Sequence, residues 1–233
     1  MKRELLAALV AARQERQGAV LVRGLTTGRQ CVVTERDRLG DVDVIDASVI
    51  DAARAALNAD GARVIEAAGE RYLVQAEATP VRMFIIGAVH IAQALIPMAR
   101  ELGYEIYLID PRTAFASPER FPDVHVDNRW PAEAMSDYRL NGRTAVVTLS
   151  HDPKIDEPAL QAAMDSNVFY IGALGSKANH AKRLERLQAL GYSEEQLSRI
   201  HGPIGLPLGG RSPAEIAVST LAQVIQSRNL NSA

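Results

Sequence analysis

The chain has 233 residues, of which 47% are hydrophobic and 23% are charged, and these proportions exclude an extended disordered chain. The formal net charge of −2 at pH 7 excludes a general electrostatic attraction to nucleic acid or to an acidic membrane surface. A single cysteine, Cys31, excludes an intrachain disulfide, and no apolar run approaches the roughly 20 residues of a membrane span, so we expect a cytoplasmic protein.

Residues 1–79 are predicted to form a small α+β domain. The spacing of apolar residues at the start of the chain predicts a helix that ends near Gln14. Strand-like runs follow at residues 19–25 and 30–35, joined by a short turn. Residues 36–41 are polar, and we expect them to form a loop.

A second helix and a hairpin are expected to complete this small domain. The helix begins with Asp46 or Ser48 as its N-cap, and Gly61 lies just past its end. Two short strands then flank a turn at Gly69. Because the region mixes helices with antiparallel strands, it differs in type from the remainder of the chain.

Thr79-Pro80 interrupts this pattern and marks the predicted boundary between residues 1–79 and residues 80–233. Beyond it, helical patterns alternate with short apolar runs, as expected for parallel strands that are buried on both faces. The predicted strands are residues 82–87, 105–110, 124–127, 144–150, 168–175 and 199–205. The fold class is therefore α/β, a Rossmann-like parallel sheet domain preceded by a smaller α+β N-terminal domain.

Four of the predicted strands end in polar, loop-forming residues. In an open parallel sheet, ligands bind beyond the carboxyl ends of the strands, so these loops hold the candidate ligand-binding residues. They are Gly87, Ala88, Val89, His90, Asp110, Arg112, His151, Asp152, Gly175, Ser176 and Lys177.

The first loop resembles a dinucleotide-binding turn with one glycine replaced. Residues 87–92 match G-x-x-x-x-A, and Val89 occupies the position where a second glycine lets the backbone approach a pyrophosphate. Asp110 lies 23 residues after Gly87, where an acid commonly holds a ribose hydroxyl. Two interpretations stay open: a working dinucleotide site, or a plain strand–helix turn with an acid that caps a loop.

The later loops suggest an anion site and proton-transfer groups. Ser176 and Lys177 begin a helix and could hold a phosphate, although Ser176 could equally be an ordinary helix cap and Lys177 a solvated charge. Arg183 adds positive charge or belongs to the wet face of that helix, as does Arg186. The candidate catalytic residues are His151, Asp152 and Lys177. The five histidines lack metal-ligand spacing, so we predict no metal site.

Several of these segments resemble one known family. The runs "FIIGAVHIAQAL", "LIDPR", "FASPERFP", "TAVVTLSHDPKIDEPAL", "FYIGALGSKANHAKRL", "RIHGPIGL" and "GRSPAEIAVS" are similar, in order and in spacing, to the Rossmann domain of the XdhC/CoxI family. The resemblance covers roughly residues 82–225 and implies a maturation factor for molybdenum hydroxylases such as xanthine dehydrogenase. Such a factor binds the molybdenum cofactor (molybdopterin), protects it, helps its sulfuration and delivers it. The implied partners are a molybdenum hydroxylase apo-enzyme and a cysteine desulfurase.

The chain departs from the family pattern in two places. Family members show G-A-G-H-V-A where residues 87–92 read G-A-V-H-I-A, and they carry a G-G-C-V-E segment that the small domain here lacks. Cys31 lies in an earlier predicted strand, so no role of the family cysteine can be transferred to it. The matching residues that can be transferred are His90, Asp110, Arg112, His151, Asp152, Gly175, Ser176 and Lys177.

We therefore carry three hypotheses. The leading one is a non-catalytic chaperone for the molybdenum cofactor, in which the glycine turns and Lys177 grip an anionic cargo. The second is an NAD(P)-dependent oxidoreductase that acts on a small carbonyl substrate, with His151 or Lys177 as proton donor. The third is an assembly partner that binds no ligand. The oligomeric state stays open, and the small domain is a candidate surface for a homodimer.

Overall fold

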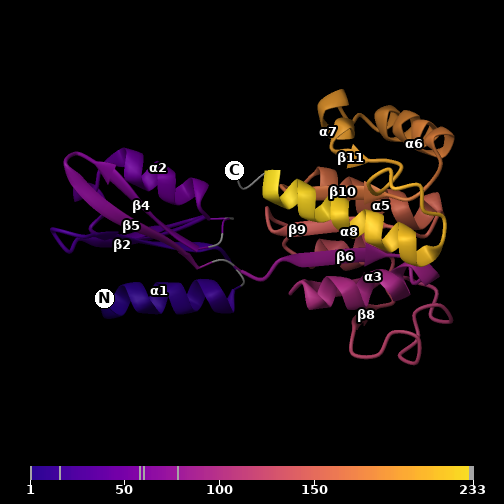
Figure 1. Cartoon of the computed structure of the whole chain (residues 1–233), viewed down its shortest axis with the longest axis horizontal. Helices are drawn as coiled ribbons and strands as arrows, with labels where there is room; N and C mark the ends of the chain where they lie inside the picture. Colours follow the sequence, from indigo (N-terminus) through magenta and orange to yellow (C-terminus); the bar gives the residue numbers. More distant parts are fainter. Residues whose placement is uncertain (1, 16, 58, 60, 78, 231–233) are drawn as a thin grey trace. The chain divides into compact units, whose positions relative to one another are not determined.

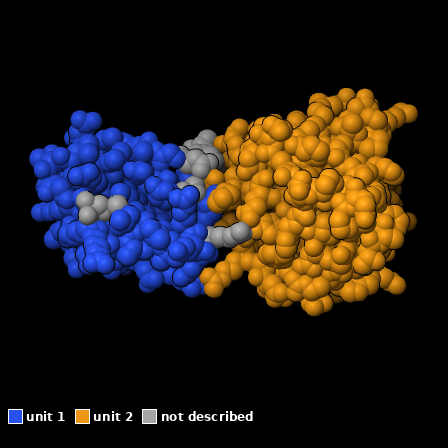
Figure 2. All heavy atoms as spheres, turned by 90° about the horizontal axis from the view of Figure 1, so that it is seen from below, with its two compact units in different colours: residues 1–79 blue, residues 80–233 orange. Residues whose placement is uncertain are grey.

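The computed structural model describes residues 2–15, 17–57, 59, 61–77 and 79–230. The chain divides into two compact units, residues 1–79 and residues 80–233, which Figure 2 shows in different colours. The first unit contains an antiparallel sheet and the second a parallel sheet, as the predicted α/β fold class requires.

The first unit is a five-stranded antiparallel sheet in the order β3-β2-β1-β5-β4 with one helix on each face. Its elements are α1 Arg3–Gln14, β1 Ala19–Gly24, β2 Gln30–Thr34, β3 Arg38–Gly40, the 3-10 turn η1 Val42–Val44, α2 Ala47–Ala55, β4 Gly61–Ala67 and β5 Glu70–Glu77. Side chains alternate along β2, so Val32 packs with Leu5 of α1 while Cys31 and Val33 pack with Val49 of α2. This alternation gives the unit two thin apolar layers.

Two predictions for this unit are wrong in detail. Residues 36–41 are not all loop, because Arg38–Gly40 form the edge strand β3, with Gly40 opposite Cys31 of β2. All three residues are exposed, so no apolar pattern marks the strand. Gly61 does not follow the second helix directly; α2 ends at Ala55 and Gly61 begins β4. Positions 58 and 60 of that predicted helix lie outside the described residues.

The second unit is a six-stranded parallel sheet in the order β11-β10-β9-β6-β7-β8. Its elements are β6 Arg82–Ile86, α3 His90–Glu101, β7 Glu105–Ile109, β8 His125–Asp127, α4 Pro131–Ser136, β9 Thr144–Thr148, α5 Pro153–Met164, β10 Tyr170–Ala173, α6 Lys177–Ala189, α7 Glu194–Ser198, β11 Ile200–His201 and α8 Pro213–Leu230. Each strand predicted for this unit is present, so the predicted alternation of strands and helices is confirmed.

Helices cover both faces of the parallel sheet (Figure 1). The side chains of Met83 and Ile85 pack in one core layer with α3 and α8, and those of Phe84 and Ile86 pack in a second layer with α4, α5 and α6. Because both faces of β6 are covered, all five of its residues are buried. This explains why residues 83–86 of the strand form a continuous apolar run.

The strand order fixes where a ligand can approach. The chain runs from β6 to β7 and β8 on one side and then returns to place β9 on the other side of β6. This is the order of a Rossmann domain, with its topological switch between β6 and β9. The sheet ends at β8, with three residues, and at β11, with two. Among the helices that the structure describes, none has the length and apolar character needed to cross a membrane.

Candidate functional site

The structure brings the four predicted loops to one edge of the parallel sheet. Gly87 follows β6, Asp110 follows β7, His151 follows β9 and Gly175 follows β10. Since β10, β9, β6 and β7 are consecutive neighbours and run in the same direction, their carboxyl ends form one rim. The predicted binding residues therefore share a single edge of this unit.

Gly87 allows two of these loops to touch at the topological switch. Its φ is 108°, a backbone conformation that side chains rarely adopt. A Cβ added there would lie 2.8 Å from the backbone nitrogen of Ser150, which belongs to the loop after β9. The glycine is therefore needed both for its backbone angle and for the close approach of the two loops.

Val89 takes up the N-cap position of α3 without a side-chain cap. Its half-buried side chain packs against the core layer that includes α3 and α8. His90 is the first residue of α3, and its side chain is exposed. The position of the missing second glycine is thus filled by a side chain that contributes to packing.

Asp110 is fully buried and joins the loops after β6 and β7. Its Oδ1 accepts hydrogen bonds from the Arg112 backbone nitrogen and Nε, both at 2.9 Å. Its Oδ2 accepts bonds from Arg112 Nη2 and from the backbone nitrogen of Ala88, both at 2.7 Å. A carboxylate offers about four lone-pair positions, and these four donors occupy them.

The same contacts determine the charge on Asp110. Burial alone would raise the pKa of this carboxyl, but the Arg112 side chain and the two backbone donors outweigh burial and lower the pKa below its usual value. Asp110 is therefore ionised at neutral pH and already engaged by protein donors. The ribose-binding role that an acid at this position often has finds no free acceptor here.

Asp156, which sequence reasoning missed, organises the loop after β9. Its buried carboxylate accepts hydrogen bonds from the Ser150 hydroxyl at 2.7 Å and from the backbone nitrogens of Ser150 and His151, both at 3.2 Å. His151 is held at a φ of 65° with its side chain exposed. Asp152 is the N-cap of α5, since its Oδ1 accepts from the Lys154 nitrogen at 2.9 Å. Asp152 thus has a structural role of its own.

The loop after β10 ends in a capped helix. Gly175 has a φ of 144°, and the Ser176 hydroxyl accepts a bond from the Asn179 nitrogen at 3.2 Å. Ser176 is therefore an ordinary N-cap of α6, whatever else it binds. Lys177 is the first residue of α6 and is exposed.

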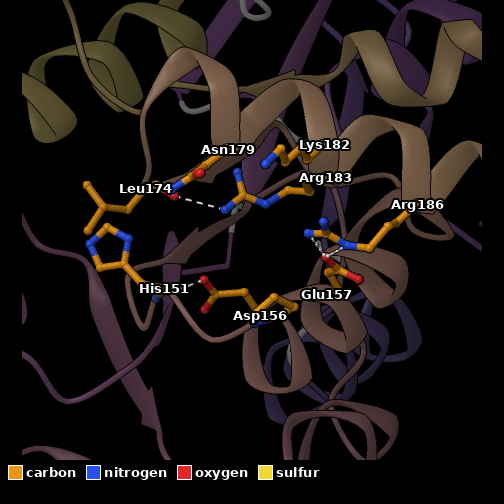
Figure 3. A pocket seen from close by; sticks show the side chains of 9 residues that line it. His151, Asp156, Glu157, Leu174, Asn179, Lys182, Arg183 and Arg186 are labelled. Carbon is orange, nitrogen blue, oxygen red and sulfur yellow. Dashed lines mark hydrogen bonds and ion pairs between the residues drawn. The ribbon is translucent and has the colours of Figure 1, made fainter.

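A polar cavity of about 180 Å³ opens between α5 and α6 beside this rim (Figure 3). The side chains that matter for its chemistry are those of His151, Asp156, Asn179, Lys182, Arg183 and Arg186. Of the residues predicted as binding residues, only His151 lines the cavity. Within the described ranges of the chain, no group of three or more His, Cys, Asp or Glu side chains is placed to hold a metal ion.

Arg183 is the unexpected member of this cavity. Its side chain does not lie on a wet face of α6, because the residue is only 6% exposed. Its Nη2 donates to the Leu174 carbonyl at 2.8 Å, while its Nη1 is buried and has no hydrogen-bond partner among the described residues. Burial lowers the pKa of Arg183 from its usual value, although the guanidinium stays charged at neutral pH. Arg186, by contrast, forms an exposed ion pair with Glu157.

Cys31 offers no accessible thiol. The side chain is fully buried between β2 and α2 in the first unit. Burial, and to a lesser degree the charge of Asp41, raises the pKa of the thiol to about 11. Since the thiolate is the reactive and metal-binding form, Cys31 is a packing residue at neutral pH.

Comparison with known proteins shows the family of this chain. The family model described as the XdhC Rossmann domain matches residues 83–224, which is more than half of the chain. The chain belongs to the XdhC family. All residues predicted to bind a ligand lie inside the segment that matches the XdhC domain, whereas Cys31 lies outside it.

Two curated relatives match this chain over a similar length. The "Molybdenum cofactor insertion chaperone PaoD" of Escherichia coli is 34% identical over 148 residues, which cover 64% of this chain and 40% of PaoD. A protein of Bacillus subtilis named as a probable xanthine dehydrogenase subunit is 30% identical over 148 residues, which cover 63% of this chain and 43% of that protein. This XdhC-family chain thus matches less than half of the length of either relative.

One solved structure has the same fold. The crystal structure of a xanthine dehydrogenase from Bacillus halodurans superposes with a TM-score of 0.67 at 20% identity, covering 98% of this chain and 66% of that one. At this level of identity the likeness concerns the fold alone. The fold alone does not define a function for the rim, so that function is inferred from the chemistry of the residues in the rim.

Proposed function

We propose that this protein is a molybdenum cofactor-binding maturation chaperone that protects the cofactor and delivers it to a xanthine dehydrogenase-type molybdenum hydroxylase. The observation that carries the proposal is the 34% identity to a molybdenum cofactor insertion chaperone, PaoD, over about the length of the parallel-sheet unit. On this proposal, an apo-hydroxylase and a cysteine desulfurase are the partners, and the molybdenum cofactor is cargo and not a resident cofactor.

The chemistry of the rim suits such a cargo. The cofactor is an anionic pterin that carries a phosphate, so its carrier needs backbone N–H donors and positive side chains. The rim supplies the first turn of α3, which has no side-chain cap, and the exposed Lys177. The cavity beside the rim adds the exposed Lys182 and the buried Arg183. These groups attract and orient an anion without any reacting side chain.

The residues predicted from sequence have different roles in this proposal. Lys177, His90 and His151 have exposed side chains at the rim and remain candidate binding residues. Gly87 and Gly175 shape the turns, and Asp110, Arg112 and Asp152 hold neighbouring loops in place. Ala88 donates its N–H to Asp110 and therefore cannot offer it to a ligand without breaking that bond.

The second candidate function is an NAD(P)-dependent oxidoreductase. The Rossmann strand order and the Gly87 turn favour it, because a dinucleotide binds at this topological switch in related folds. The saturated carboxylate of Asp110 and the side chain of Val89 oppose it, since they remove the ribose acceptor and narrow the backbone approach to a pyrophosphate. The chaperone proposal is therefore preferred.

Thermal unfolding with each ligand separates the two functions. A ligand at a hundred times its Kd stabilises a protein by about 2.7 kcal/mol. We expect such a shift with anaerobically released molybdenum cofactor and none with NAD(H) or NADP(H). A shift with a dinucleotide and none with the cofactor would favour the oxidoreductase, and no shift with any of them would favour a ligand-free assembly partner.

A variant of Lys177 tests the rim itself. Because Lys177 is an exposed charge, we expect Lys177→Ala to weaken cofactor binding by about threefold and to leave the unfolding temperature unchanged. Arg100→Ala is the matched control, since it removes one exposed positive charge from the last turn of α3, at the opposite end of the sheet. Equal affinities of the two variants would remove Lys177 from the site.

A further inference from the structure

The cavity between α5 and α6 contains a buried cation with an unused donor. Arg183 is 6% exposed, and its Nη2 donates to the Leu174 carbonyl at 2.8 Å. Its Nη1 is shielded from solvent and makes no hydrogen bond with any residue that the structure describes. Leaving a buried charged donor unsatisfied destabilises a protein, so such a group usually marks the place of a water, an ion or a ligand.

The surroundings of Arg183 favour an anion over a neutral ligand. Figure 3 shows its guanidinium among the side chains of the cavity, with Asn179 and Lys182 on the same helix. Lys182 adds a second positive charge, and Asn179 an amide donor, on the first turns of α6, the end of a helix that favours negative charge. Arg186 is the exception, because Glu157 already neutralises it.

Two carboxylates, those of Asp156 and Glu157, also line the cavity and interact electrostatically with Arg183. Asp156 is buried there, but its two oxygens accept the bonds from Ser150 and His151 described above. Burial nevertheless raises the pKa of Asp156, and its carboxylate interacts electrostatically with Arg183, although the two form no ion pair among the contacts of the described residues. Three cations, Lys182, Arg183 and Arg186, line the cavity against these two carboxylates, so the net charge of the cavity wall is positive.

We propose that this cavity is a phosphate-binding site in which Arg183 is the central ligand, with Lys182 and Asn179 beside it. The inference rests on the proposed function in one respect: the group bound there is the terminal phosphate of the molybdenum cofactor. A tetrahedral oxyanion can accept several hydrogen bonds at once, and a guanidinium matches two of its oxygens. A cavity of about 180 Å³ far exceeds the ~10–15 Å³ that one water needs, so a phosphate and its hydration fit.

This assignment places the phosphate away from the dinucleotide position. In a Rossmann domain the pyrophosphate lies at the first glycine turn, here Gly87, next to the switch between β6 and β9. The cavity lies instead beyond β9 and β10, on the face covered by α5 and α6. A phosphate bound in the cavity would hold the cargo at this edge of the sheet without using the Gly87 turn. Val89 and Asp110 disfavour pyrophosphate binding at that turn.

Calorimetric titration with inorganic phosphate tests the cavity without the cofactor. The wild-type chain is expected to bind phosphate, with sodium chloride of equal ionic strength as the blank. Arg183→Lys should weaken binding by at least about tenfold and Lys182→Ala by about threefold, since they remove a charge-assisted donor and an exposed charge respectively. Arg100→Ala, the matched control, should bind like wild type. If Arg183→Lys does not fold, Lys182→Ala still decides, because Lys182 is exposed.

Two outcomes would overturn the phosphate site. One is a wild-type chain that binds phosphate no better than chloride, and the other is phosphate binding that Lys182→Ala and Arg183→Lys leave unchanged. A parallel titration with the molybdenum cofactor tests the link to the cargo. Loss of phosphate binding with unchanged cofactor affinity would refute that link, whereas phosphate binding without any cofactor binding would refute the proposed function and leave the cavity assignment standing.

Discussion

Asp110 and Arg112 form a bidentate ion pair at the carboxyl end of β7, in which Arg112 Nε and Nη2 each donate to a different oxygen of Asp110. Asp127 and Arg129 repeat the arrangement at the end of β8, with the same backbone bond from the second residue to the first. Asp110 in addition accepts a bond from Ala88 in the loop after β6. The first pair therefore joins two loops of the rim, whereas Arg129 of the second pair also bonds Asp137 at the C-terminal end of α4.

Asp110→Asn is expected to lower the free energy of unfolding by about 2–4 kcal/mol. The asparagine amide keeps one acceptor oxygen, but its NH2 group replaces Oδ2 and faces two donors, the Ala88 nitrogen and Arg112 Nη2. A buried hydrogen bond and an ion pair are therefore lost together. Asp127→Asn is the matched control and should cost less, because the loop after β6 does not depend on it. Urea unfolding of both variants measures the difference. Equal losses would show that the bond to Ala88 contributes little.

The same carboxyl gives the stability a defined pH dependence. The pKa of Asp110 lies below its usual value in the folded chain, so its contribution is fully present above the unfolded pKa of about 3.9 and is lost as the pH falls through the folded pKa. The stability gap between wild type and Asp110→Asn should therefore be constant from pH 7 to pH 5 and shrink below pH 4. Unfolding curves across this range provide the check, and a gap that widens in acid would contradict the assignment.

Gly87→Ala should be more destabilising than the same change at Gly103. Both glycines have positive φ, at 108° and 78°, so alanine is strained at either position by about 1 kcal/mol. A Cβ at position 87 also meets the Ser150 backbone, whereas nothing lies within 4 Å of a Cβ at position 103. We expect a loss of about 2 kcal/mol or more for Gly87→Ala and about 1 kcal/mol for Gly103→Ala. Similar unfolding temperatures would show that the two loops separate easily.

His151→Gly should stabilise the fold while it weakens binding. The residue is held at a φ of 65°, which glycine adopts without strain, so a gain of about 0.5–1 kcal/mol is expected. The exposed imidazole beside the cavity is lost, and cofactor affinity should fall. Asp123→Gly, at a φ of 59° in the β7–β8 loop, should also stabilise and leave affinity unchanged. Equal affinities of both variants and wild type would remove His151 from the binding surface.

The parallel sheet could be predicted from sequence because its burial leaves a direct trace. Strands such as Arg82–Ile86 are covered on both faces, so they appear as apolar runs between helical patterns. The rim followed from the same alternation, since the carboxyl ends of parallel strands must meet at one edge. The edge strand Arg38–Gly40 could not be predicted in this way, because backbone pairing with β2 holds it and no side chain there is buried.

The cavity could not be predicted from the sequence because its central residues are charged. On α6, Arg183 lies four residues before the buried Leu187, so helical spacing places both on the inner face. Asp156 likewise precedes the buried Ala159 and Leu160 on α5. Charged residues are mostly exposed, and a reading by type assigns them to the solvent side. Charged residues in phase with a buried helical stripe are the signal that could have found the cavity.

The short strands at the two edges of the parallel sheet affect how readily this unit associates with other polypeptides at high concentration. An extended segment of another polypeptide that met β8 or β11 would face three or two residues of backbone, too few to template a growing ribbon. Edge-to-edge polymerisation through this sheet is therefore disfavoured by the shortness of its two edge strands.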